Sequence, residues 1–266
     1  MKPITLRTKI NLRYRLDLTL ISQFKNTKIN EIKDMEVLYG NKIYRLRDIF
    51  TITGDDSDNI IIKSSNHLID NIGKFFTGET ITIHGNVGHC VGSEMKKGLL
   101  TVYGNTLDYL ASGMQNGIIK VFGSCGNYLC GKPNHKNEGM TDGTIYVSGN
   151  VGDHALQRIR RGTIVIDGDI GNHSCIEMIS GTIVIKGKIG KYFGEKIKRG
   201  TVIIKDKKFT KNYKKSLGCT YNFFPFFARE LNSLLNKKVI KSNVRFDRYS
   251  YHKDESNLSE IFVISN

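Results

Sequence analysis

Glycine recurs at an almost constant spacing along the middle of this 266-residue chain, and the spacing is the strongest constraint on its fold. From Gly143 onwards the spacing is 19 residues, and similar segments come before it. The anchor glycines that open these segments are Gly78, Gly98, Gly117, Gly143, Gly162, Gly181 and Gly200. A fixed period of this length indicates a chain built from stacked, equivalent units.

Each anchor glycine begins a similar pattern, in which aliphatic residues alternate with other residues and a second glycine usually follows, as in Gly162-Thr-Ile-Val-Ile-Asp-Gly168. Alternation with a period of two predicts a short strand with one buried face. The residues expected on that face are Leu100, Val102, Ile119, Val121, Ile145, Val147, Ile164, Ile166, Ile183, Ile185, Val202 and Ile204. Strands this short bury their apolar face only by stacking on their neighbours.

We therefore predict an all-β fold, a right-handed parallel β-solenoid (β-helix) of Gly-rich coils of about 19 residues. In this prediction, residues 1–77 form a small N-terminal cap with degenerate coils, and residues 78–206 form the solenoid repeats. Residues 207–266 form an α/β tail, made of a basic linker, a helix and a C-terminal strand. A left-handed helix of hexapeptide repeats does not fit, because its period is one residue shorter.

The chain is strongly basic, with 40 Lys and Arg against 25 Asp and Glu. Such a surface attracts acidic partners, which leaves nucleic acid, an acidic protein and a polyanionic cofactor as candidates. Lys97, Arg161 and Arg199 each come directly before an anchor glycine, so we expect them at one corner of the coils. They form a hypothetical polyanion-binding site, and the alternative is a corner that serves solubility alone.

A row of apolar side chains is expected on the outer face of the strands, where it would form a contiguous patch. Its members, our interface candidates, are Tyr103, Phe122, Tyr146, Val165, Val184 and Ile203. Either a partner protein, or the N-terminal cap or C-terminal tail of the same chain, would cover them.

No catalytic set is recognisable in the sequence. Glycine-rich turns such as Gly85-Asn-Val-Gly88 lead into further strands, whereas a phosphate-binding loop leads into a helix. His154 and His173 hold equivalent positions and should stack in a ladder with Tyr109, Tyr128 and Tyr192. Even with Cys175 nearby they fall short of the four ligands of a closed zinc site. We predict no catalytic residue, no metal site and no directly bound cofactor.

The sequence also favours a cytoplasmic protein without a membrane partner. It contains no apolar run of the roughly 20 residues that span a bilayer, and its N-terminus lacks the apolar core of a signal peptide. The five cysteines are scattered and never form a C-x-x-C pair, which is typical of reduced thiols.

The run from Gly85 to Gly98, Gly-Asn-Val-Gly-His-Cys-Val-Gly-Ser-Glu-Met-Lys-Lys-Gly, resembles the signature of the C-subunit of formylmethanofuran dehydrogenase. Related coils occur in the C-terminal domain of the large subunit of glutamate synthase. Gly54-Asp-Asp-Ser-Asp58 and residues 217–231 most resemble the bacterial branch, the C-subunit of the formyltransferase/hydrolase complex. Some coils depart from the family pattern, with Leu107, Cys130, Leu156 and Cys175 in the place of glycine.

The resemblance implies a scaffold subunit that is not an enzyme on its own, in an enzyme complex of one-carbon metabolism. Such complexes act on a formyl group that is bound to a methanofuran-type carrier. They couple this formyl group to tetrahydromethanopterin. The oxidoreductase type carries a molybdenum or tungsten cofactor in a partner subunit, and the bacterial type hydrolyses the formyl carrier to formate. The implied partners are amidohydrolase-like, formyltransferase-like and molybdopterin-enzyme-like subunits.

The basic corner adds a hypothesis about the carrier. Methanofuran-type carriers have glutamate-rich arms, and Lys97, Arg161 and Arg199 would suit such a polyglutamate arm. Two other functions remain as alternatives to a subunit of such a complex. The chain could be a glutamate synthase-type solenoid module or a basic solenoid that binds nucleic acid. Because no nucleic-acid-binding motif is present, we do not expect nucleic acid as the partner.

Overall fold

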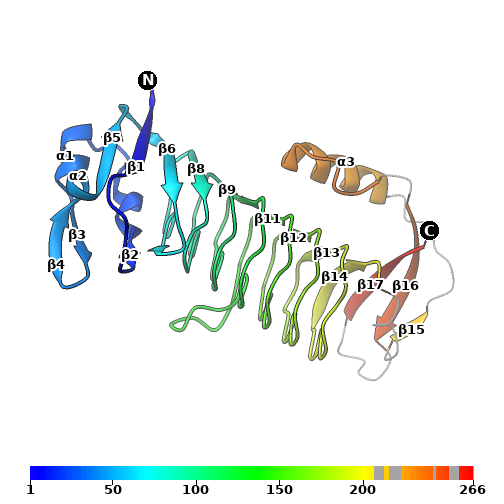
Figure 1. Ribbon diagram of the computed structural model, residues 1–266. Helices are drawn as coiled ribbons and strands as arrows, with labels where there is room; N and C mark the ends of the chain where they lie inside the picture. The colour runs from blue at the N-terminus through cyan, green and yellow to red at the C-terminus, as the bar shows by residue number, and fades with distance from the viewer. Residues whose placement is uncertain (207–212, 216–222, 242–243, 252–257, 266) are drawn as a thin grey trace.

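The computed structural model is organised around one long sheet (Figure 1) and describes residues 1–206, 213–215, 223–241, 244–251 and 258–265. The sheet has 13 strands in the order β15-β16-β17-β14-β13-β12-β11-β10-β9-β8-β6-β1-β5. Its central strands are β8 (Thr80–Gly85), β9 (Leu99–Tyr103), β10 (Ile118–Val121), β11 (Thr144–Val147), β12 (Thr163–Ile166), β13 (Thr182–Ile185) and β14 (Arg199–Ile204). These central strands are parallel to one another.

The N-terminal segment extends the long sheet and adds a second, four-stranded sheet in the order β4-β3-β2-β7. Strand β6 pairs with β8 and with β1, and β5 is antiparallel to β1. The elements of this segment are β1 (Pro3–Thr8), β2 (Leu16–Asp17), the 3-10 helix η1 (Thr19–Gln23), α1 (Ile29–Asp34), β3 (Glu36–Tyr39), β4 (Lys42–Arg45), α2 (Leu46–Ile49), β5 (Phe50–Thr53), β6 (Asp56–Ser65) and β7 (Ile69–Asp70).

The register of the central strands aligns residues that are 19 apart, such as Ile145, Ile164 and Ile183. All twelve residues expected on the inward strand face are buried, as predicted. Met95, Met114, Met140 and Met178 are buried beside them. Alternation and alignment together therefore make one continuous aliphatic core along the sheet.

The predicted fold class, an all-β right-handed solenoid, is wrong. The structure has one large, mostly parallel sheet, one small sheet and several helices. Each segment from β8 to β14 contributes a single strand to the large sheet. Elsewhere in these segments the described β-pairing between neighbours is limited to isolated bridges, which join Cys125 to Val151, Val151 to Ile170 and Ile170 to Ile189. Single backbone hydrogen bonds, such as that from Cys175 N–H to the carbonyl oxygen of Ala155, also link neighbouring segments.

The reason lies in the backbone between the strands. His173, Cys175 and Glu177 have positive φ angles of 55°, 60° and 53°. Equivalent residues of the neighbouring segments, such as Tyr128 and Cys130, do the same. A strand needs a continuous extended backbone, and left-handed residues at every second position interrupt it. Turns therefore replace the further strands that the spacing led us to expect.

The C-terminal segment returns to the sheet and covers part of its outer face. Its elements are β15 (Tyr213–Lys215), α3 (Phe224–Leu235), β16 (Arg245–Tyr251) and β17 (Leu258–Ser265). Strand β17 is parallel to β14, and β16 is antiparallel to β17. Most of the predicted basic linker, apart from residues 213–215, lies outside the described residues. Among the described helices, none has the length and apolar character needed to cross a membrane.

Helix α3 follows from its sequence. Pro225 stands in the first turn, where its missing N–H costs nothing. Asn236 ends the helix in the left-handed conformation, with a φ of 49°. The face formed by Phe224, Ala228, Leu231 and Leu235 is buried against the sheet.

Candidate functional site

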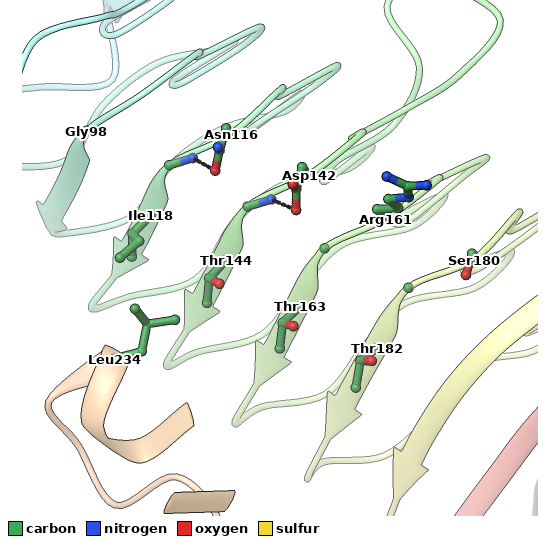
Figure 2. A pocket seen from close by; sticks show the side chains of 14 residues that line it. Gly98, Asn116, Ile118, Asp142, Thr144, Arg161, Thr163, Ser180, Thr182 and Leu234 are labelled. Atoms are coloured by element: carbon green, nitrogen blue, oxygen red, sulfur yellow. Dashed lines mark hydrogen bonds between the residues drawn. The ribbon is translucent and has the colours of Figure 1, made fainter. Parts of the chain in front are cut away.

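A groove runs along the starts of the central strands, where the anchor glycines lie (Figure 2). It has a volume of about 660 Å³. We call it the strand-start groove, and its lining residues are Gly98, Asn116, Gly117, Ile118, Asp142, Gly143, Thr144, Arg161, Gly162, Thr163, Ser180, Gly181, Thr182 and Leu234. All of them except Leu234, which belongs to α3, come from the beginnings of parallel strands or the turns before them.

The anchor glycines shape the floor of this groove. Gly162 has a φ of +111°, a left-handed conformation that favours glycine. A Cβ at Gly162 would lie 2.6 Å from the Cε of Met140 and 2.8 Å from the carbonyl oxygen of Gly143. Glycine is therefore required both by its backbone angle and by the close approach of the preceding segment.

The residues before the anchor glycines form one line along the groove, and they differ in what they do (Figure 2). Asn116 and Asp142 each accept a hydrogen bond of 2.7 Å, through Oδ1, from the N–H of the following glycine. Within the described part of the chain, Arg161 and Ser180 make no corresponding bond. Within the described residues, the N–H groups of Gly162 and Gly181 have no hydrogen-bond partner, and Arg161 directly precedes Gly162.

Arg161 is also the unpaired cation of this groove. Its neighbour Arg160 is held by Glu138, with Nη1 lying 3.0 Å from Oε2. Arg161 is exposed and forms no ion pair with the described residues. A groove that presents both an exposed guanidinium and free backbone N–H groups can bind a carboxylate or another oxyanion.

Two further residues of the predicted polyanion-binding site lie outside the groove. Lys97 and Arg199 occupy the position equivalent to Arg161 on other segments, and both are exposed. Since strands are spaced by roughly 4.8 Å, Arg199 is two strands, or roughly 10 Å, from Arg161. Lys97 is three strands away on the other side. The structure therefore places the three cations in a line and brings Arg161 alone into the groove.

The predicted row of interface residues is in fact two rows. The strand register aligns Tyr146 with Lys120, and Tyr103 with His84. The rings of His84, Tyr103 and Phe122 stack at centroid distances of 5.3 and 5.2 Å. The two rows are separate because Tyr103 and Phe122 lie five residues after their anchor glycine, whereas Tyr146 lies three residues after its own.

These two rows have different environments. Tyr146, Val165, Val184 and Ile203 form a helix-covered row, which is buried beneath α3 together with Phe262. Tyr103 and Phe122 belong to an open row, and their exposed fractions are 50% and 40%. Within the candidate set, only the open row remains on the surface of the described chain.

A polar cluster fixes the edge of the helix-covered row. The hydroxyl of Tyr146 donates to Oδ2 of Asp167 at 2.6 Å and accepts a hydrogen bond from Nζ of Lys237. Burial, together with the bond to Asp167, raises the pKa of Tyr146. Burial alone would raise the pKa of Asp167, but hydrogen bonds from Lys186 and Tyr146 hold it below its usual value. The cluster is thus a charged link between the sheet and the segment after α3.

The predicted ladder of planar side chains is confirmed. Rings of Tyr109, Tyr128, His154, His173 and Tyr192 stack in order, with centroid distances of 4.8, 5.2, 5.1 and 4.8 Å. Cys175 is buried, and burial raises the pKa of its thiol well above the usual value. Among the described residues, no cluster of His, Cys, Asp and Glu is suited to a metal ion. The stacked rings therefore pack successive segments against one another.

Sequence reasoning missed one buried charge. The carboxylate of Glu94 is 4% exposed, and its Oε2 lies 3.1 Å from Nε2 of His135 and also contacts Nζ of Lys136. Burial alone would raise the pKa of Glu94, but these two hydrogen bonds lower it. The sequence offered a faint signal, since a single acid stands here among buried residues. Its partners lie just before Met140, where the step between the anchor glycines Gly117 and Gly143 is longer than the others, and they could not be inferred.

Comparison with known proteins gives three findings. The sequence matches the GXGXG motif family over residues 60–221. The C-subunit of the tungsten-containing formylmethanofuran dehydrogenase 2 of Methanothermobacter marburgensis is 33% identical over 75 residues, 26% of this chain and 28% of that protein. Its counterpart in Methanothermobacter wolfeii is 32% identical over 75 residues. The match thus covers 28% of the length of these curated relatives.

The third finding concerns the whole chain. A chain of the formyltransferase/hydrolase complex (FhcABCD) from Methylorubrum extorquens, solved in complex with methylofuran, superimposes with a TM-score of 0.87. It is 26% identical in sequence, and the superposition covers 98% of this chain and 100% of that one. Both the N-terminal and the C-terminal segments are therefore part of the shared fold.

Proposed function

The chain belongs to the GXGXG motif family, and from this premise we propose that it is a non-catalytic structural component, the C-subunit, of a formylmethanofuran dehydrogenase or formyltransferase/hydrolase complex. The observation that carries the proposal is the similarity of fold over 98% of the chain to a chain of such a complex. The curated relatives, which are themselves C-subunits of a formylmethanofuran dehydrogenase, support it.

The chemistry of the described residues agrees with a structural role. Cys125, Cys130 and Cys175 are buried, and burial raises the pKa of each thiol, which makes them poor nucleophiles. His154 and His173 are stacked between aromatic rings. Catalysis in the complex would then rest on partner subunits of the amidohydrolase-like, formyltransferase-like or molybdopterin-enzyme-like kind.

The strand-start groove suits the carrier of such a complex. The related solved complex contains methylofuran. Carriers of this type are expected to have glutamate-rich arms, and a glutamate carboxylate matches Arg161 with the free N–H groups of Gly162 and Gly181. Arg199 and Lys97 would extend the same line of positive charge. In this proposal the groove holds part of the arm and leaves the formyl group to the partner subunits.

Affinity purification of the chain from its own cells, followed by mass spectrometry, tests the assembly. Recovery of an amidohydrolase-like and a formyltransferase-like subunit supports the proposal. A further subunit with molybdenum or tungsten would identify the dehydrogenase type, and the same subunit without metal would identify the hydrolase type. Recovery of the chain alone, or of nucleic acid alone, would refute it.

A charge-reversal variant tests the role of the groove in the purified complex. Arg161→Glu with Arg199→Glu should weaken carrier retention at least about tenfold, because charge-assisted hydrogen bonds are lost. The remaining retention should respond less to added salt. Lys28→Glu with Lys42→Glu is the matched control, since both lysines are exposed and belong to the N-terminal segment, which contributes no residue to the groove. Equal retention by the two double variants would contradict the proposed groove.

A further inference from the structure

A second pocket lies on the outer face of the sheet, near the ends of β13 and β14, and it is strongly basic. Its volume is about 690 Å³. We call it the basic pocket, and its lining residues are Val184, Lys186, Lys205, Lys238, Val239, Ile240, Lys241, Val244, Arg245 and Ile264. Half of these side chains are cationic and half are aliphatic, and none is acidic.

The frame of the pocket is firmly held. Lys186 and Lys205 follow equivalent positions of the adjacent strands β13 and β14. The segment after α3 is anchored by Asn232, whose Oδ1 accepts hydrogen bonds from the N–H groups of Val239 and Ile240 at 2.6 and 3.1 Å. Val239 and Ile240 are themselves buried against the helix-covered row. The cations therefore stand on a rigid support.

Ion pairs with the described residues compensate only one of the five positive charges of this pocket. Lys186 is paired with Asp167, with Nζ 2.6 Å from Oδ1. Lys205, Lys238, Lys241 and Arg245 are exposed and form no ion pair with any described residue. Like charges held close together repel, and a bound anion relieves the repulsion. The cluster of cations therefore favours an anionic ligand in this pocket.

The lining indicates which kind of anion fits. Its described residues include no glycine and no hydroxyl residue that could bring backbone or side-chain donors close to a phosphate group. Among the lining residues that the structure describes, there is no aromatic ring on which a nucleobase could stack. Lysine side chains are long, flexible point charges that suit separate carboxylates. The aliphatic half of the pocket suits an apolar side chain between them.

We propose that the basic pocket binds an acidic peptide segment of a partner protein, with carboxylates on both sides of one aliphatic side chain. The pocket shares no lining residue with the strand-start groove. The inference goes beyond the proposed function and does not require it, because it rests on the charge and lining of this pocket alone.

The test uses the full chain and a fluorescein-labelled peptide, Glu-Asp-Leu-Asp-Glu, whose binding is followed by fluorescence anisotropy at low ionic strength. The expected result is saturable binding that Lys238→Glu with Lys241→Glu weakens by about tenfold or more. The control variant, Lys28→Glu with Lys42→Glu, carries the same change in net charge and should bind like the wild type. Serine in place of leucine in the peptide should weaken binding by about tenfold.

Each other outcome overturns the proposal. No saturable binding to the wild type, or equal binding by the pocket variant, would show that the pocket does not hold the peptide. An equal loss in the control variant would reduce the effect to net charge. Thermal unfolding verifies that the pocket variant is folded, and Lys241→Gln provides a milder change with the same expected direction. Because Arg161 and Arg199 are untouched, failure here leaves the test of carrier retention unaffected.

Discussion

Lys120 on β10 reaches across to the C-terminal end of α3, where its Nζ donates to the carbonyl oxygens of Leu234 and Leu235 at 3.4 and 3.0 Å. Lys120 and Leu234 are 114 positions apart in the chain. Burial lowers the pKa of Lys120. A cation at a helix C-terminus satisfies orphan carbonyl groups and the negative end of the helix dipole. Lys120 therefore holds α3 on the sheet through these hydrogen bonds.

Lys120→Met should loosen α3 without unfolding the sheet. The substitution keeps the apolar stem and removes the charge-assisted hydrogen bonds, which are worth about 1–2 kcal/mol. Hydrogen exchange of the α3 amides should become faster, and exchange of the amides in β9 and β10 should be unchanged. Lys188→Met, at an exposed position, is the control. Unchanged exchange in α3 would show that Lys120 does not hold the helix.

Tyr146→Phe should destabilise the protein by about 1–2 kcal/mol, because Tyr146 is buried and its hydroxyl bonds to both Lys237 and Asp167. Urea unfolding measures the loss. A double-mutant cycle with Lys237→Met isolates the coupling between the two residues. Strict additivity of the two single losses would rule out the link that we infer from the geometry.

Glu94→Gln should change how stability depends on pH. The pKa of Glu94 is lowered in the folded state, so its contribution is present above the unfolded value, near 4.5. That contribution is lost as the pH falls through the lower folded value. The variant should be about 1–2 kcal/mol less stable at pH 7 and should lose less stability than the wild type on acidification.

Urea unfolding between about pH 3 and pH 7 provides the measurement for Glu94. The control is Glu79→Gln, since Glu79 is exposed and its side chain forms no ion pair with the described residues. Parallel stability curves for the wild type and Glu94→Gln would contradict the role assigned to Lys136 and His135.

Gly162→Ala should destabilise the protein by about 3 kcal/mol, because alanine is strained at a φ of +111° and its Cβ would lie 2.8 Å from the backbone carbonyl oxygen of Gly143. Gly131→Ala is the matched comparison. The nearest heavy atom to a Cβ there is the carbonyl oxygen of Tyr128, at 3.2 Å, and the φ of Gly131 is not positive. Thermal unfolding should show a much smaller loss for Gly131→Ala. Similar losses in both variants would refute the argument from backbone angle and space.

Local patterns in the sequence were enough to predict the inward face of the sheet. Ile164 and Ile166 alternate with polar or outward residues, and alternation alone decides which side of a strand is buried. The stacking of His154 on His173 was predictable for a related reason. Equivalent positions in successive segments must lie one strand apart when parallel strands are in register.

The arrangement outside the strands was beyond the reach of this reasoning. A constant spacing shows that segments are equivalent, but it does not show how many strands each contains. The positive φ of non-glycine residues such as Cys175 and Glu177 leaves one strand in each segment. The two-residue offset between Phe122 and Tyr146 also changed which residues share a row.

The sequence by itself therefore determined the period, the buried aliphatic column and the basic corner, because these depend on residues close together in the chain. Tertiary structure alone decided that α3 buries Val165 and Val184, and that Arg161 and Leu234 line one groove. It also gathered Lys186, Lys205 and Lys241 around one pocket. Contacts of this kind join segments far apart in the chain, and they form only when the segment after β14 folds back over the sheet.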